Sequence, residues 1–138
     1  MTNGTKSYGE ISDIPESYQR YIDVIYNLSK KKRGGWVTNK GIAESLQVEP
    51  ASVSGMLEKL KKKGLIKWEP RKSIRLTDKG RMYAKQLDEI EKLLQTFFKE
   101  VLKIDDEELV EKISCEIEHH ITREVKESFK EFLLKYHK

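Results

Sequence analysis

The chain of 138 residues has 27 Lys and Arg against 23 Asp and Glu, and 37% of its residues are hydrophobic. This length fits one domain or two small ones, and no apolar run reaches the roughly 18 residues of a membrane-spanning helix. Residues 1–10 are polar and Cys115 is the single cysteine, so we expect a cytoplasmic protein without a secretory signal, disulfide framework or membrane contact.

Charge is distributed unevenly along the chain. Residues 1–85 hold 18 Lys and Arg against 9 Asp and Glu, a net charge of +9. Residues 86–138 hold 9 basic against 14 acidic residues, a net charge of −5. This asymmetry predicts a front half that meets a polyanion and a back half that avoids one or gathers cations.

The first predicted elements are helices. Apolar residues at helical spacing predict a helix from Pro15 to Lys30, followed by glycines that permit a turn and a short strand at 36–37. Thr38 is a good N-cap for a short second helix, and Pro50 suits the first position of a third helix that ends at Gly64. These elements predict a helix-turn-helix.

The apolar period changes after Gly64. Residues 65–69 and 73–77 read as two short β-segments joined by residues 70–72, which predicts a hairpin with a basic tip. Two helices joined by a tight turn and followed by such a hairpin are the parts of a winged helix-turn-helix. We therefore predict a mostly α fold with a small β-hairpin wing, in which residues 1–80 form the DNA-binding domain.

Several polar side chains of this unit are candidates for contact with double-stranded DNA. Serines near the start of the third helix can enter a major groove, although serines there also serve as local caps. The Lys run that ends this helix suits phosphates but equally suits a solvated helix end, whereas cations at the hairpin tip have little core to cover. The predicted DNA-binding residues are Thr38, Ser52, Ser54, Lys59, Arg71 and Lys72.

A long helix of about 24 residues is predicted to start after Thr77. Its apolar face is wider than one small winged domain can cover. A second copy of the chain is the simplest acceptor, although the later helices can also fold back over it. A homodimer suits DNA, because two recognition helices one turn apart read a palindrome. We expect residues 81–138 to form a helical dimerisation and metal-sensing domain.

Candidate metal ligands lie on a later predicted helix that opens with the acidic residues 105–108. Cys115, Glu118 and His119 stand at i, i+3 and i+4, so on an α-helix they share one face. Thiolate, carboxylate and imidazole together form a ligand set for Fe(II), Co(II), Mn(II) or Zn(II). A polar helix face with a small core cysteine would show the same pattern.

With these motifs in place, the chain resembles the diphtheria-toxin-repressor and manganese-transport-regulator family of metal-dependent repressors over nearly its whole length. The resemblance implies a homodimer that binds operator DNA when loaded with Fe(II) or Mn(II) and represses metal-homeostasis genes. It also implies the shorter, manganese-branch architecture. It rests on Tyr21–Tyr26, Ile42–Leu46, Val53-Ser54, Leu76–Gly80 and Glu118–His120.

The resemblance implies a primary site formed by Cys115, Glu118 and His119, with the cysteine typical of iron-type members. It places Asp23 where the manganese branch has a carboxylate and Glu91 where the family normally has His. Arg20 stands where the family offers Asp or Met, and a guanidinium cannot coordinate a cation. The ancillary ligands are altered as well, to Gln95 and Glu111, and Gly55 replaces a base-reading glutamine of some iron-type members.

Three alternatives stay open at this point. An ion pair of Arg20 with Glu118 or Asp23 would favour a metal-independent winged-helix regulator with a degenerate metal site. An enzyme is disfavoured, because the sequence has no phosphate loop, no zinc-protease helix and no nucleophile with an ordered base. A protein-interaction module that uses the wing for protein contacts is disfavoured by the basic front half.

Overall fold

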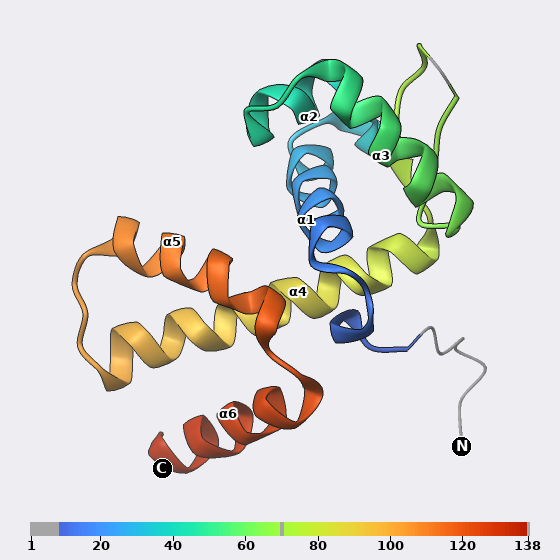
Figure 1. The fold of residues 1–138 in the computed structure, drawn as a ribbon. Helices are drawn as coiled ribbons and strands as arrows, with labels where there is room; N and C mark the ends of the chain where they lie inside the picture. Colours follow the sequence, from blue (N-terminus) through green and yellow to red (C-terminus); the bar gives the residue numbers. More distant parts are fainter. Residues whose placement is uncertain (1–8, 70, 138) are drawn as a thin grey trace.

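The computed structural model describes residues 9–69 and 71–137. These residues form six α-helices and one two-stranded hairpin, with the helix-turn-helix and the hairpin at one end and the two last helices at the other (Figure 1). Among the described residues, no helix is long and apolar enough to cross a membrane. The mostly α fold with a hairpin wing is confirmed.

The helix-turn-helix follows the capping signals of the sequence. Helix α1 spans Glu16–Lys30, α2 spans Asn39–Leu46 and α3 spans Pro50–Lys62. Thr38 caps α2, since its side chain accepts from the Gly41 N–H at 3.0 Å. Gln47 adopts a left-handed conformation at φ 57°, which ends α2 and turns the chain toward α3.

The wing is shorter than the two predicted segments. Strand β1 spans Ile66–Lys67 and pairs antiparallel with β2, Arg75–Leu76, while Val37 forms a single bridge to Ile74. The predicted strand at 36–37 is therefore one bridge. Beyond these pairs the hairpin lies at the edge of the molecule, where the described residues supply no third strand to pair with its backbone groups.

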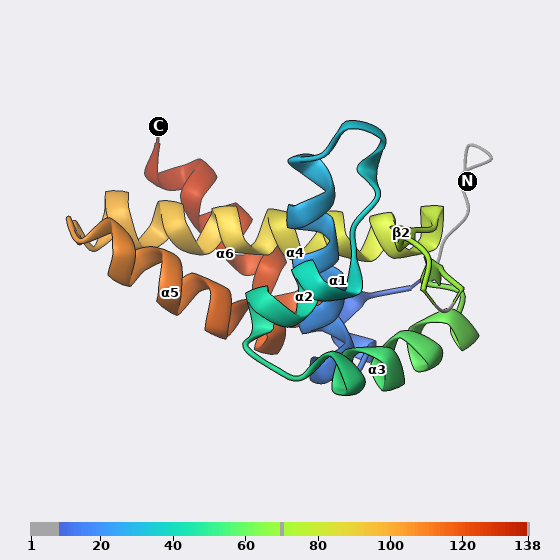
Figure 2. The ribbon, with the colours of Figure 1, turned by 90° about the horizontal axis from the view of Figure 1, so that it is seen from above.

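Helix α4 is the axis on which both halves pack. It spans Asp78–Thr96 and continues through a π-helical turn, Phe97–Val101, so the predicted long helix is confirmed. Gly80 allows its first turn to approach the wing, because a Cβ there would lie 2.2 Å from the Leu65 carbonyl oxygen. Helix α1 crosses α4 near its middle (Figures 1 and 2).

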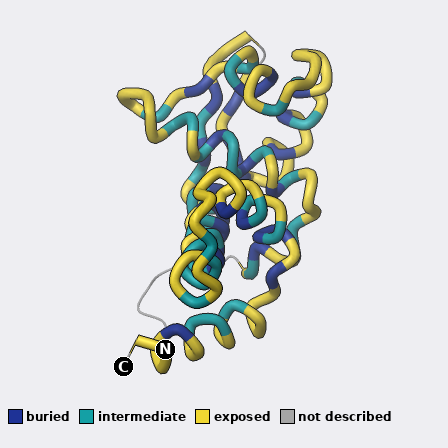
Figure 3. The backbone as a smooth tube through the Cα atoms, turned by 90° about the vertical axis from the view of Figure 1, so that its left-hand side faces the viewer, coloured by how far each residue is buried: buried dark blue, intermediate teal, exposed yellow. Residues whose placement is uncertain are grey.

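The second half folds back along α4. Helix α5 spans Glu107–Ile117, a 3-10 turn follows at Glu118–His120, and α6 spans Arg123–Tyr136. Helix α6, lowest in Figure 3, buries only Leu133 and leaves most other residues exposed. Its exposed apolar side chains include Phe132, Leu134 and Tyr136.

Candidate metal centre and DNA-binding surface

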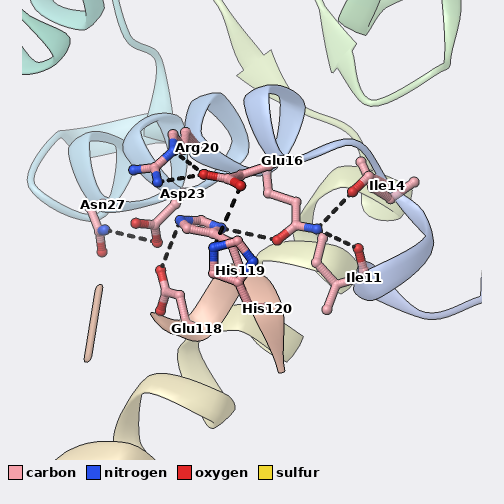
Figure 4. Close-up of polar contacts among 10 residues, drawn as sticks. Ile11, Ile14, Glu16, Arg20, Asp23, Asn27, Glu118, His119 and His120 are labelled. Atoms are coloured by element: carbon pink, nitrogen blue, oxygen red, sulfur yellow. Dashed lines mark hydrogen bonds and ion pairs between the residues drawn. The ribbon is translucent and has the colours of Figure 1, made fainter. Parts of the chain in front are cut away.

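Three potential metal ligands gather between α1 and the end of α5. Asp23 lies on α1, Cys115 on α5 and Glu118 in the 3-10 turn that follows. One ligand atom from each of them lies within 4.8 Å of the others. Figure 4 shows the carboxylates of Asp23 and Glu118 facing the same space. The chain thus brings ligands more than ninety positions apart in the sequence to one point.

A change of helix type arranges these ligands. The α-helix ends at Ile117, so the predicted single α-helix through Cys115, Glu118 and His119 is wrong in this detail. In a 3-10 turn, residues three apart eclipse one another and residues four apart diverge. The tighter turn is consistent with Glu118 staying on the side of Cys115 while His119 rotates toward α1.

Glu118 is the most perturbed group of the cluster. Its residue is 1% exposed, and among the described residues neither carboxylate oxygen has a hydrogen-bond partner. Burial, followed by the negative charges of Asp23 and Glu91, raises its pKa to about 10. A buried carboxyl without a donor or cation is costly in its charged form. The site is thus centred on a buried carboxyl group that no hydrogen-bond donor or ion-paired cation compensates in the described part of the chain.

The neighbouring acids are perturbed in the same direction. Burial, followed by the charge of Glu118, raises the pKa of the Cys115 thiol to about 12. Burial and then the charge of Asp23 raise the pKa of Glu91, on α4, to about 7. The pKa of Asp23 is itself raised, first by burial. A bound divalent cation would reverse this trend, so the donor set fits such an ion.

His119 lies beside the three-ligand cluster. Its Nε2 is 3.6 Å from Glu118 Oε1, and its Nδ1 is 3.0 Å from the side-chain oxygen of Gln19. Burial, followed by the charge of Arg20, lowers the pKa of the imidazole to about 4. His119 is therefore neutral near pH 7, which is the form that ligates metals.

Arg20 does not form the ion pair with Glu118 or Asp23 that a metal-independent regulator would use. Its guanidinium pairs with Glu16 one turn earlier on α1 at 2.6 Å, whereas the expected partners Glu118 and Asp23 are not its ion-pair partners. The expected lock is wrong, because Arg20 is exposed on the helix and Glu16 is its nearest acid. Glu16 also lies 3.6 Å from the Nε2 of His120. The cluster carboxylates therefore make no ion pair with Arg20 among the described residues, although the charge of Arg20 still opposes the rise in the pKa of Glu118.

The predicted DNA-binding residues occupy α2, α3 and the wing. Ser52 and Lys59 are exposed on α3. Ser54 accepts a hydrogen bond from Asn39 at 3.0 Å, which links α3 to the start of α2. Arg71 and Lys72 are exposed at the hairpin tip, and Arg71 has a left-handed backbone at φ 67°.

Sequence reasoning missed two residues of these sites. Asn39 follows an N-cap, a position with no sequence signal for its contact with α3. Gln19 is 2% exposed and reaches His119 across 100 positions. A buried amide on an otherwise apolar helix face was the available signal for Gln19, because buried polar groups require partners.

A winged helix-turn-helix joined to a helical unit with clustered metal ligands defines a metal-responsive DNA-binding transcriptional regulator. Two family models match the chain. The iron dependent repressor N-terminal DNA binding domain matches residues 13–74, and the iron dependent repressor metal binding and dimerisation domain matches residues 77–138. The chain belongs to the iron-dependent repressor family.

Named relatives agree with this assignment. The chain is 35% identical over 106 residues to the transcriptional regulator MntR of Oceanobacillus iheyensis, covering 77% of this chain and 69% of MntR. It is 31% identical over 123 residues to an uncharacterised helix-turn-helix regulator of Methanocaldococcus jannaschii, covering 89% of this chain and 97% of that protein.

Solved structures share the fold. A manganese-dependent transcriptional repressor in complex with manganese superposes with a TM-score of 0.73 at 26% identity, over 84% of this chain and 52% of that one. The chain thus spans about half the length of that repressor. IdeR of T. acidophilum, at 21% identity and a TM-score of 0.62, shows the likeness of fold alone.

Proposed function

We propose that the chain is a homodimeric repressor that binds operator DNA when Fe(II) or Mn(II) occupies the Asp23, Cys115 and Glu118 cluster. One observation carries this proposal: both oxygens of the buried Glu118 carboxyl are without a hydrogen-bond donor among the described residues, beside two further ligand atoms. Natural proteins pair nearly all buried polar groups, so such a carboxyl calls for a cation.

We assign each ligand a role from its position. Asp23 and Glu118 would supply oxygens, Cys115 a thiolate and His119 the imidazole nitrogen that faces Glu118. Glu91 would supply a further carboxylate from α4. When bound, the metal supplies the positive charge that keeps these carboxyl and thiol groups ionised.

The choice of metal follows from the donor set and the relatives. Carboxylates suit Mn(II), whereas a thiolate and an imidazole suit Fe(II) and softer ions. One structural neighbour is named a manganese-dependent transcriptional repressor, and the family is named for iron. We therefore propose Mn(II) or Fe(II), with Co(II) and Zn(II) as ions that the same ligands would accept in solution.

The link to DNA follows from where the ligands lie. Asp23 belongs to the helix that carries α2 and α3, whereas Cys115 and Glu118 belong to the part that folds back along α4. Ligation from both sides favours one arrangement of the DNA-binding unit on the dimerising unit. We place the boundary of these units at residues 80 and 81.

We assign the DNA contacts by position. Ser52 and Ser54 would lie near base edges in the major groove, while Lys59, Arg71 and Lys72 would meet phosphates. Thr38, exposed at the start of α2, would add a backbone contact. The partner is double-stranded operator DNA, and the second subunit would cover the apolar side chains of α6.

Metal binding by the purified full chain tests the site. Co(II) is the probe, because a thiolate ligand gives a charge-transfer absorption band that carboxylates do not. The band should appear with the wild type, disappear in Cys115→Ser and weaken in Glu118→Gln. Glu116→Gln, an exposed neighbour on α5, is the matched control and should behave as the wild type. An unchanged band in Cys115→Ser contradicts the assigned ligand set.

A further inference from the structure

A buried amide joins the metal centre to the segment before α1. Gln19 is 2% exposed and its side chain makes hydrogen bonds to three groups. The Nε2 of Gln19 donates to the carbonyl oxygens of Ile11 at 2.9 Å and Ile14 at 2.7 Å. The Oε1 of Gln19 lies 3.0 Å from the Nδ1 of His119. Both N–H donors and the oxygen of this amide are thus directed at protein groups.

These contacts determine which atom carries each proton. The two carbonyl oxygens only accept, so the amide NH₂ must face them, because an amide oxygen there would meet two like dipoles. The amide oxygen is thereby turned to His119, and it can only accept. The Nδ1 of His119 must therefore donate. A neutral imidazole has one N–H, so its Nε2 is left with a free lone pair.

We propose that Gln19 is a positioning residue that fixes His119 in the Nδ1–H tautomer and aims the lone pair of Nε2 at the metal cluster. The Nε2 atom lies 3.6 Å from Glu118 Oε1, on the cluster side of the ring. The predicted effect on metal affinity rests on the proposed metal site, whereas the tautomer of His119 is a property of the metal-free chain.

The contact with Gln19 should preorganise His119 for metal binding. A histidine ligand usually donates its second N–H to a fixed acceptor, and loss of that acceptor typically weakens metal affinity about 10- to 100-fold. Without Gln19, His119 would divide between two tautomers and more than one ring orientation. The carbonyls of Ile11 and Ile14 hold the amide in place, so the segment before α1 supports the ligand indirectly.

A second glutamine offers a matched control. The Nε2 of Gln86, on α4, donates to the Gly9 carbonyl at 3.0 Å, and its Oε1 accepts from the Ile11 N–H at 2.7 Å. Gln86 thus ties down the same segment through the same kind of side chain, while His119 is not among its hydrogen-bond partners. Gln86→Met removes these two contacts but keeps the Ile11 and Ile14 carbonyls that hold Gln19, so it should leave the tautomer of His119 unchanged.

Long-range ¹H–¹⁵N NMR of the metal-free full chain tests the proposal, because it identifies the protonated ring nitrogen of each histidine. At neutral pH, His119 of the wild type and of Gln86→Met should show the Nδ1–H pattern. Gln19→Met, which has no acceptor, should lose that pattern. Gln19→Glu should stay protonated, because its buried carboxyl faces the Ile11 and Ile14 carbonyls; it can then donate to one of them, keep an acceptor for Nδ1 and retain the pattern. The exposed His120 and His137 serve as internal references.

Mn(II) affinity, measured by competition with a chelator, provides the second readout. Gln19→Met should bind Mn(II) about 10- to 100-fold more weakly than Gln86→Met, and Gln19→Glu should recover part of the loss. A wild-type His119 with Nε2–H, or a Gln19→Met chain that keeps Nδ1–H, overturns the proposal. If Gln19→Met does not fold, the wild-type and Gln19→Glu spectra decide. A wild type with the expected tautomer that binds no Mn(II) refutes the proposed metal site instead and supports the hydrogen-bond assignment.

Discussion

Replacing Glu118 by glutamine should make the metal-free protein more stable while it weakens the metal site. The folded-state pKa of this carboxyl is about 10, against an ordinary value of 4.5. Because the folded state holds a proton that the unfolded state releases above pH 4.5, the free energy of unfolding falls as pH rises from 4.5 toward 10. At about 1.4 kcal/mol per pH unit, this group costs about 3 kcal/mol at pH 7.

Glutamine has a similar shape and no charge, so it should remove that cost. Chemical denaturation in chelator, at one protein concentration, should give Glu118→Gln about 3 kcal/mol more stability than the wild type at pH 7. The difference should shrink toward pH 5. His119 has the opposite effect on the pH dependence: because its pKa in the folded state is lowered to about 4, the free energy of unfolding falls as pH drops below 6.5. This contribution is present in both proteins and does not explain a difference between them.

Saturating Mn(II) should reverse the order of stability. At a metal concentration 1,000 times Kd the wild type should gain about 4 kcal/mol, which exceeds its deficit of about 3 kcal/mol in chelator, and the variant should gain little. Glu116→Gln, on the exposed side of α5, should match the wild type in both conditions. A Glu118→Gln chain that is no more stable than the wild type in chelator, or a difference that does not vary between pH 5 and 8, would refute the reasoning.

Four further predictions follow from the same structure. Replacing both Arg71 and Lys72 by alanine should lower the slope of log affinity against log salt by about 2 in operator-binding titrations; an unchanged slope would remove the wing from the phosphate contacts. Arg20→Ala should tighten Mn(II) binding by less than about tenfold in chelator competition, because its partly exposed charge opposes a cation; weaker binding would contradict this. Leu134→Glu should weaken the dimer about tenfold or more in sedimentation, since Leu134 is 72% exposed, and an unchanged dimer would place the interface elsewhere. Gly80→Ala should cost at least about 2 kcal/mol in denaturation, and a smaller loss would mean that the wing shifts freely.

Local signals in the sequence predicted most of the fold. Thr38 and Pro50 marked the starts of α2 and α3, and the apolar period after Thr77 predicted the long α4. The strands were overestimated, because alternation describes side chains, whereas pairing requires a neighbouring strand, and β1 and β2 have only each other and the bridge from Val37.

The candidate metal site was predictable in composition and less so in geometry. The i, i+3 spacing predicted that Cys115 and Glu118 lie on one side of a helix. It assumed a regular α-helix, however, and did not predict the change to a 3-10 turn at Glu118. Contacts between distant positions were beyond reach, such as Gln19 with His119 across 100 positions. The pairing of Arg20 depended on rotamer choice among nearby acids, which a sequence does not specify.

The most direct test of a metal-dependent repressor is operator binding itself. Gel shifts against promoter fragments from the host genome, in chelator and with added Fe(II), Mn(II) or Zn(II), should be made with the wild type, Cys115→Ala and His119→Ala. The account predicts that Fe(II) or Mn(II) tightens binding by the wild type and that both substitutions abolish this gain. Equally tight binding in chelator would contradict it and leave a metal-independent winged-helix regulator.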